Sequence, residues 1–218
     1  MVGRGDTMKK IGILSALLAA MLLGTAALTG CGPSQQLTST DGGFVSQTGG
    51  KYQAAPMRYM PVALEDEWGA LDHKKPYGMR LYTLPDMDAD AWLAAEDGTV
   101  FYADGVTLPT LAEMAPTAVY VYTNDEAAVM KAEITDADVV AGLVAACAED
   151  KGGSFSSAAT LSSEYSVRFA SEQYPGLYYC LRYVEYEDAY YLYDGETRTH
   201  YAIGEEIFRA LYPLDETQ

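Results

Sequence analysis

The sequence contains few of the residues that nucleophilic or metal-assisted catalysis requires. It has two histidines, His73 and His200, and three cysteines, all far apart along the chain. The motifs G-x-S-x-G, S-x-x-K and H-E-x-x-H are absent, so the sequence indicates neither a familiar serine hydrolase nor a zinc peptidase. A zinc site would need clustered histidines and cysteines. We therefore predict a protein that is not an enzyme and that carries no cofactor.

Basic residues are also scarce. The chain has 14 lysines and arginines against 31 aspartates and glutamates, which gives a formal net charge of −17 at pH 7. Such an excess of negative charge repels the phosphate backbone of nucleic acids and anionic lipid headgroups. We therefore expect no nucleic-acid partner.

The N-terminal segment has the layout of a secretory signal. Arg4, Lys9 and Lys10 precede an apolar run at residues 11–28, which is borderline in length for a membrane span of about 20 apolar residues. We therefore assign residues 1–30 to a signal peptide and exclude them from the fold.

The apolar run ends in Leu28-Thr29-Gly30-Cys31, which resembles the lipobox of bacterial lipoproteins. The resemblance implies that the signal is cut before Cys31 and that the Cys31 thiol carries diacylglycerol. Acylated Cys31 would then hold the protein in the lipid bilayer, at the extracytoplasmic face of the cell membrane. Met8-Lys9-Lys10 resembles the usual start of such signals, so translation could begin at either Met1 or Met8. Cleavage would remove three basic residues and one acidic residue, for a net charge of about −19.

The rest of the chain divides by composition. Residues 31–56 are rich in glycine, serine, threonine and glutamine and have neither helical nor strand periodicity, which predicts a flexible tether. Residues 57–213 are long enough to bury a core, and we predict that they form one domain, followed by a tail at 214–218.

The predicted domain has an irregular first part and a patterned second part. The first part runs to about residue 116 and includes strands at 79–84 and 99–103, separated by a short helix across 88–96. The second part, 117–213, contains a β-hairpin, a helix capped at Thr135-Asp136, an antiparallel meander and a closing helix. This order predicts the α+β class, an antiparallel sheet with a C-terminal β-meander and helices packed on one face.

The same second part loosely resembles uncharacterised α+β domains of Gram-positive surface lipoproteins. The resemblance rests on the helix start Glu133-Ile134-Thr135-Asp136 and on the tyrosine-rich stretch at 178–193. It implies no known activity.

An acidic stretch, DMDADAWLAAED at 86–97, places carboxylates at positions 1, 3, 5 and 12 of a calcium loop; these are Asp86, Asp88, Asp90 and Asp97. Calcium prefers six to eight oxygen ligands, which carboxylates supply. The pattern departs from the motif because position 6 is Ala91 instead of glycine and position 12 is aspartate instead of glutamate. The alternative is a short helix whose acidic residues cap it and lie in its first turn.

The meander is rich in tyrosine. Because neighbouring strand residues point to opposite faces, these tyrosines cannot all lie in the core. An exposed aromatic row would suit a glycan or protein ligand, and the candidate binding face consists of Tyr178, Tyr186, Tyr190, Tyr191 and Tyr193. The alternative is that these tyrosines form cross-strand pairs that only stabilise the sheet.

The sequence does not decide whether the two remaining cysteines, Cys147 and Cys180, form a disulfide bond. Cys147 continues an apolar helical stripe, whereas Cys180 shares its strand face with Arg182, so the pattern places them on opposite sides of the sheet.

Together these features predict a membrane-anchored extracytoplasmic lipoprotein with a binding or envelope-associated module. One alternative is a calcium-dependent binding module that uses the 86–97 stretch. The other is a small hydrolase with two carboxylates about 5–10 Å apart, a distance that sequence does not give.

The lipobox yields the first testable prediction. In a bacterial host fed labelled palmitate, the full chain should incorporate label and partition into the detergent phase of a Triton X-114 extract. Cys31→Ser should abolish both properties because it removes the acylated thiol. Cys180→Ser serves as the matched control and should retain both; label retained by Cys31→Ser would refute the prediction.

Overall fold

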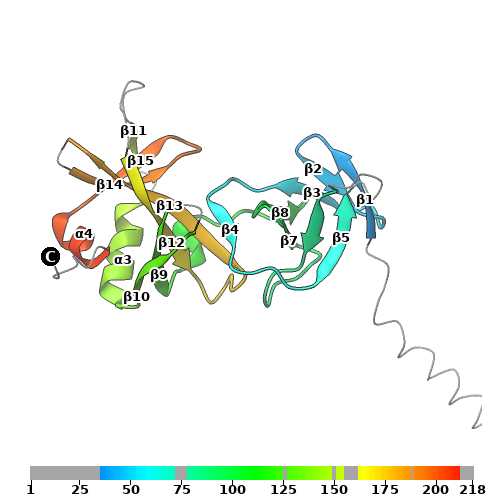
Figure 1. Cartoon of the computed structure of the whole chain (residues 1–218), viewed down its shortest axis with the longest axis horizontal. Helices are drawn as coiled ribbons and strands as arrows, with labels where there is room; N and C mark the ends of the chain where they lie inside the picture. Colours follow the sequence, from blue (N-terminus) through cyan, green and yellow to red (C-terminus); the bar gives the residue numbers. More distant parts are fainter. Residues whose placement is uncertain are drawn as a thin grey trace, which may run out of the picture. The chain divides into compact units, whose positions relative to one another are not determined.

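The computed structural model describes residues 35–71, 78–124, 127–148, 151–154, 162–187 and 189–211. These residues all belong to the compact unit Gln35–Gln218. They form two sheets and three short helices, which Figure 1 shows in sequence order from blue to red. Among them, no helix is long and apolar enough to span a membrane.

The first sheet is a closed barrel of seven strands. Its order around the barrel is β1-β2-β3-β8-β7-β6-β5, and a parallel pairing of β1 with β5 closes it. The strands are β1 (Gln35–Thr40), β2 (Gly43–Val45), β3 (Lys51–Ala54), β5 (Glu67–Leu71), β6 (Arg80–Tyr82), β7 (Trp92–Ala95) and β8 (Val100–Ala103).

A two-residue turn at Asp41 and Gly42 joins β1 to β2. Gly42 has φ +74°, a conformation that glycine adopts without steric cost, and Asp-Gly is a common pair in such hairpin turns. At Gly43 a Cβ atom would lie 2.0 Å from the carbonyl oxygen of Tyr52, so only glycine lets β3 approach this closely.

Large side chains fill the barrel. Phe44 is fully buried, stacks on Tyr52 with ring centroids 4.7 Å apart, and meets Phe101 edge-on at 5.3 Å. We call this set the barrel core; it consists of Leu37, Phe44, Tyr52, Leu81, Leu93, Ala95 and Phe101. Residues 35–54, which we expected to be a flexible tether, therefore supply three strands and part of a hydrophobic core.

The expected helix across 88–96 is a turn followed by strand β7. The prediction failed because all four residues of β7 are buried and apolar. Leu93 and Ala95 face the barrel core, whereas Trp92 and Ala94 pack into a second core outside the barrel. A short apolar run that is buried on both faces lacks the period-two alternation that distinguishes a strand from a helix in sequence.

The second sheet has eight strands. Its main order is β10-β9-β12-β13-β14-β15-β11, and β4 pairs with β13 beside this path. The strands are β4 (Tyr59–Pro61), β9 (Ala118–Thr123), β10 (Met130–Ile134), β11 (Gly153–Ser154), β12 (Ser162–Ala170), β13 (Leu177–Tyr186), β14 (Ala189–Asp194) and β15 (Thr199–Ile203).

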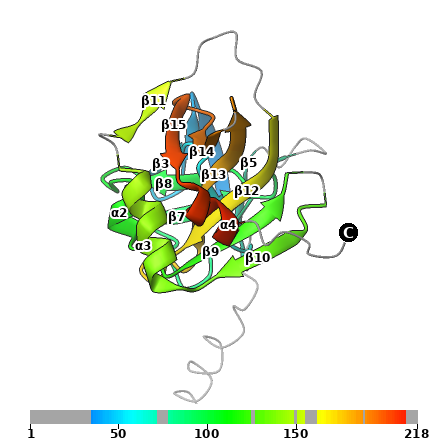
Figure 2. The ribbon, with the colours of Figure 1, turned by 90° about the vertical axis from the view of Figure 1, so that its left-hand side faces the viewer.

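Three helices accompany this sheet: α2 (Leu111–Met114), α3 (Ala137–Ala146) and α4 (Glu205–Leu211). Helix α3 contacts β9 and β15, and α4 contacts β10; Figure 2 shows both helices in front of the strands. The Asp136 carboxylate accepts hydrogen bonds from the backbone N–H groups of Asp138 and Val139, which confirms the predicted N-cap of α3.

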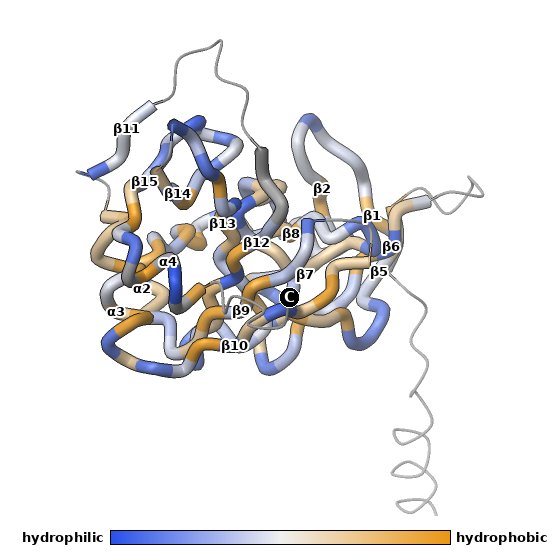
Figure 3. Tube along the Cα trace, turned by 60° about the vertical axis from the view of Figure 1, so that its left-hand side comes forward, coloured by the Kyte–Doolittle hydropathy of each residue, from blue (hydrophilic) through white to orange (hydrophobic). Residues whose placement is uncertain are grey.

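Between the helices and the second sheet lies what we call the sheet core. Val140 and Leu143 of α3 pack there with Val121, Phe169 and Leu181. Figure 3 shows apolar stretches running through the strands and α3, with hydrophilic stretches in the turns.

The predicted α+β class is wrong. The described residues form fifteen strands, seven of them in a closed barrel, and the protein is mostly β. The predicted strands at 79–84 and 99–103 are confirmed as β6 and β8. The error arose elsewhere in residues 35–116, where strands of three to six residues carry too few positions to show periodicity.

The barrel makes Phe44 a test of the N-terminal strands. Phe44→Ala in the full chain should lower the free energy of unfolding by about 3–5 kcal/mol, because it leaves a cavity beside Tyr52 and Phe101. Denaturant unfolding measures this, with Met57→Ala as control because Met57 is 74% exposed. A Phe44→Ala variant as stable as the control would mean that residues 35–54 are a tether after all.

Candidate functional site

A pocket of about 340 Å³ opens where two strands fail to meet. Strand β13 has ten residues and pairs with β12 along one edge. Along its other edge, β4 covers Leu177–Tyr179 and β14 covers Arg182–Tyr186. Cys180 and Leu181 lie between these two pairings, and both line the pocket. The volume falls within the range of about 300–1,000 Å³ that is typical of small-molecule sites.

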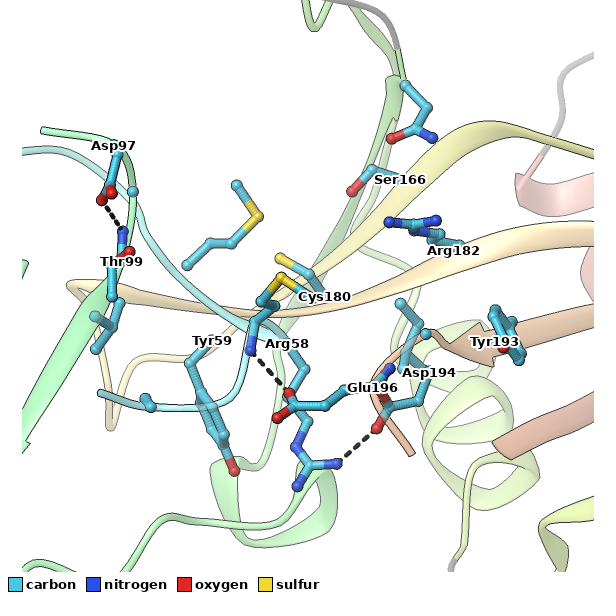
Figure 4. Close-up of a pocket in the computed structure, with 18 residues that line it drawn as sticks. Arg58, Tyr59, Asp97, Thr99, Ser166, Cys180, Arg182, Tyr193, Asp194 and Glu196 are labelled. Carbon is cyan, nitrogen blue, oxygen red and sulfur yellow. Dashed lines mark hydrogen bonds and ion pairs between the residues drawn. The ribbon is translucent and has the colours of Figure 1, made fainter. Parts of the chain in front are cut away.

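An ion pair bridges the gap between the two strands. Arg58, just before β4, places Nη1 2.6 Å from Oδ2 of Asp194, the last residue of β14 (Figure 4). The Arg58 carbonyl also accepts a hydrogen bond of 2.6 Å from the Cys180 N–H group. The Met57 N–H group donates to Oε2 of Glu196 at 3.0 Å. The segment before β4 is thus fastened to the turn between β14 and β15.

Asp194 is almost fully buried, with 4% of its side chain exposed. Its Oδ1 accepts hydrogen bonds from the N–H groups of Glu196 at 2.9 Å and Thr197 at 3.4 Å. Burying a carboxylate is costly unless it is paired and hydrogen-bonded, and this one is both. The Asp194 carboxylate therefore stabilises the turn between β14 and β15.

Two tyrosines support the Arg58 guanidinium. Its Cζ lies 5.8 Å from the ring centroid of Tyr59 and 6.0 Å from that of Tyr179, and the two rings meet edge-on at 5.5 Å. Burial raises the pKa of both phenols, which outweighs the opposite effect of Arg58, so both are neutral at physiological pH. The Tyr59 hydroxyl donates to the carbonyl of Pro109 at 2.6 Å.

The pocket floor comes from three strands of the second sheet. Arg182 of β13 pairs with Ser166 of β12 and with Tyr193 of β14, so their side chains point to one face, and Cys180 precedes Arg182 by two residues on that face. This face lies opposite the sheet core, because the alternating residues Leu181 and Tyr183 point into that core. The Arg182 side chain is exposed and, within the described ranges, forms no ion pair or hydrogen bond.

The opposite wall is the turn between β7 and β8. Asp97 accepts a hydrogen bond from the Thr99 N–H group at 2.9 Å, and Figure 4 shows its carboxylate turned toward Thr99; both residues line the cavity. Asp97 and Glu196 are exposed, and neither has a lysine or arginine within 4 Å in the described part of the chain. The pocket therefore has a cation on its floor and carboxylates on its rim.

The two cysteines are unpaired in the structure. Cys147 is buried in the sheet core, and Cys180 lies on the opposite face, as the sequence pattern indicated. Burial raises the pKa of Cys180 to about 12, with a smaller opposing effect from Arg168. The thiol is therefore protonated at neutral pH and is a poor nucleophile.

The structure does not assemble the four aspartates of the calcium pattern into one site. Asp86, Asp88 and Asp90 precede β7, and Asp97 follows it, so the strand separates them by roughly 13 Å. Asp88 accepts a hydrogen bond from the Asp90 N–H group at 2.9 Å and thus caps the turn. Throughout the described segments, no three histidine, cysteine, aspartate or glutamate side chains lie close enough to hold a metal ion.

The five tyrosines of the candidate binding face divide between two faces. Tyr178, Tyr186, Tyr191 and Tyr193 lie on the pocket side by register, but Tyr190 packs against the sheet core, where it stacks on Tyr183 at 6.2 Å. All five are half-buried. Only Tyr193 lines the pocket.

On the pocket side of the second sheet, Arg168 packs against tyrosine rings. The Arg168 guanidinium lies 4.0 Å from the ring centroid of Tyr122 and 6.0 Å from that of Tyr178. Tyr120 meets Tyr178 edge-on at 5.9 Å. Sequence analysis missed Arg58, Arg168 and Arg182, because arginines spaced along separate strands form no local motif.

No protein-family model, curated protein or solved structure matches this chain.

The Arg58–Asp194 pair yields a stability prediction. Arg58→Met should lower the free energy of unfolding by about 2–3 kcal/mol, because it leaves the buried Asp194 carboxylate without its cation. The cost is below that of a fully buried pair because a quarter of the Arg58 side chain is exposed. Adding Asp194→Asn should recover part of the loss.

Denaturant unfolding of the two single variants and the double variant measures this coupling. Arg209→Met is the matched control, because Arg209 pairs with Glu205 at 2.6 Å on the exposed surface of α4 and should cost less than about 0.5 kcal/mol. Equal costs for Arg58→Met and Arg209→Met would show that the bridge does not hold the gap.

Proposed function

We propose that this protein is a lipid-anchored, extracytoplasmic binding protein that holds a small ligand in the pocket between β4 and β14. The observation that carries the proposal is the Arg182 guanidinium on the pocket floor, which has no protein partner among the described residues. An exposed arginine at the base of a cavity offers five N–H donors to a ligand in a fixed geometry.

The location rests on the lipobox at Leu28-Thr29-Gly30-Cys31. Acylated Cys31 would anchor the chain in the cell membrane with the folded region outside the cytoplasm. The acidic composition is compatible with this location, because it disfavours adhesion of the folded region to anionic headgroups.

A binding role fits the pocket better than catalysis. The Cys180 thiol is not ionised at neutral pH, so it is a poor nucleophile. Ser166 would need a neighbouring base to act as a nucleophile, and no histidine is among the described residues that line the pocket. Asp194 is held by Arg58 and two backbone N–H groups, so it is not free to act as one of the two carboxylates of a hydrolase. These features support a site that recognises a ligand and releases it unchanged.

The proposal is tested by thermal unfolding of the full-length chain with single compounds at 10 mM. The panel is alanine, Ala-Ala, glucose, galacturonate, phosphate and spermidine. At least one compound should raise the unfolding midpoint, because a ligand at a hundred times its Kd stabilises the folded state by about 2.7 kcal/mol.

Ser166→Trp should abolish the rise, because the indole would occupy the pocket floor opposite Arg182. Ser154→Trp places the same side chain on the exposed strand β11 and should leave the rise intact. The proposal fails if no compound shifts the midpoint, or if a folded Ser166→Trp variant responds like the unsubstituted chain.

A further inference from the structure

We propose that the ligand of this pocket is a small zwitterion, an α-amino acid or short peptide, whose carboxylate binds Arg182 and whose ammonium group binds Glu196. This inference rests on the proposed binding function of the same pocket. It follows from the separation of charge within the cavity, where the cation and the carboxylates come from different elements.

The carboxylate end is set by the floor. The Arg182 side chain rises from β13 with Ser166 directly across on β12, so a guanidinium and a hydroxyl lie side by side. A guanidinium binds a carboxylate through two parallel N–H bonds, and a serine hydroxyl can donate a third. The turn after β14 lies beside this guanidinium, because a Cβ added at Gly195 would be 3.8 Å from the Arg182 Cζ atom.

The ammonium end is set by the rim. Glu196 follows Gly195, where an added Cβ would lie 3.8 Å from the Arg182 Cζ atom, so Glu196 belongs to the turn beside the guanidinium. Its carboxylate uses one oxygen to accept the Met57 N–H group and keeps the second oxygen for a ligand. The hydrogen bond also fixes the orientation of this side chain, so less conformational freedom is lost when a ligand binds.

Other ligand classes fit this charge pattern less well. A dianion would meet the two rim carboxylates and the strongly negative field of the whole chain. A polyamine would leave Arg182 facing another cation. A neutral sugar would leave the charges of all three groups uncompensated. A zwitterion satisfies both signs and carries no net charge that the protein's field would repel.

The pocket also has apolar surface for a side chain. Met57, Met60 and Val100 line it together with the ring of Tyr193. Methionine side chains adapt to ligands of different shape, so this wall favours small apolar side chains without selecting one of them. The volume of about 340 Å³ is at the low end for ligand sites, which limits the peptide to a few residues.

The test uses Ala-Ala, N-acetyl-Ala-Ala and Ala-Ala-amide with the full-length chain, and calorimetric titration gives Kd for each. Ala-Ala should bind, and blocking either end should weaken binding tenfold or more, because each block removes one charge-assisted contact. Equal affinity for the free and blocked dipeptides would overturn the inference.

Matched variants locate the two ends. In Arg182→Gln, amidation of the ligand should raise Kd less than twofold, because the free carboxylate no longer has a partner to lose. In Arg182→Lys, amidation should raise Kd by more than in Arg182→Gln, because lysine still offers a cation. In Glu196→Gln, N-acetylation of the ligand should weaken binding less than twofold. The amide retains an oxygen that can accept the Met57 N–H group, so the turn is preserved. Arg209→Gln, on α4, is the control and should behave like the unsubstituted chain.

The outcomes separate this inference from the proposed function. Binding of glucose, galacturonate, phosphate or spermidine without binding of alanine or Ala-Ala overturns the zwitterion and leaves the binding function standing. If amidation still raises Kd tenfold in a folded Arg182→Gln variant, the ligand carboxylate binds elsewhere, and the inference is also overturned. Failure of every compound overturns both proposals.

Discussion

Alternate residues of β7 face two different hydrophobic cores, and this constraint links the barrel to the second sheet. Leu93 and Ala95 belong to the barrel core, and Trp92 and Ala94 belong to the sheet core. A four-residue strand that is buried on both faces cannot move without opening both cores. The β7–β8 turn, which carries Asp97, is consequently fixed relative to the β-strands that form the pocket floor.

The pocket is a consequence of strand length. Strand β13 is longer than either β4 or β14, and together these two strands still leave its edge uncovered at Cys180 and Leu181. Edge backbone groups need partners, and the Arg58 carbonyl supplies one through the Cys180 N–H group. The Arg58–Asp194 ion pair then ties the ends of both strands together, so that the gap persists as a defined cavity.

Charge is distributed unevenly for so acidic a protein. Asp194 is neutralised by Arg58 and stabilises the turn after β14, whereas Arg182 is exposed on the pocket floor. Arg168 is stacked over Tyr122 on the same face. The scarcity of basic residues makes it notable that three of them gather around one cavity and the sheet face beside it.

The sequence predicted the second half of the chain better than the first. The hairpin, the N-cap at Asp136, the strands rich in tyrosine and the closing helix agree with β9, β10, α3, β12–β15 and α4, because strands of five to ten residues and a ten-residue helix are long enough to show their periods. Of the barrel, only β6 and β8 were predicted as strands, because the other strands are short and β7 is apolar on both faces. Even the Asp41-Gly42 turn signal was obscured by the surrounding polar, glycine-rich composition.

By itself, the sequence determined the acidic charge, the Leu28-Thr29-Gly30-Cys31 stretch that resembles a lipobox, and which residues of β13 alternate between the two faces of the sheet. Only the tertiary structure decided that Arg58 meets Asp194, 136 positions away, and that Tyr193 of β14 lies opposite Arg182 of β13. The reason is physical: alternation along a strand is local, whereas the register between strands and the partner of a charge depend on chain segments that meet only after folding.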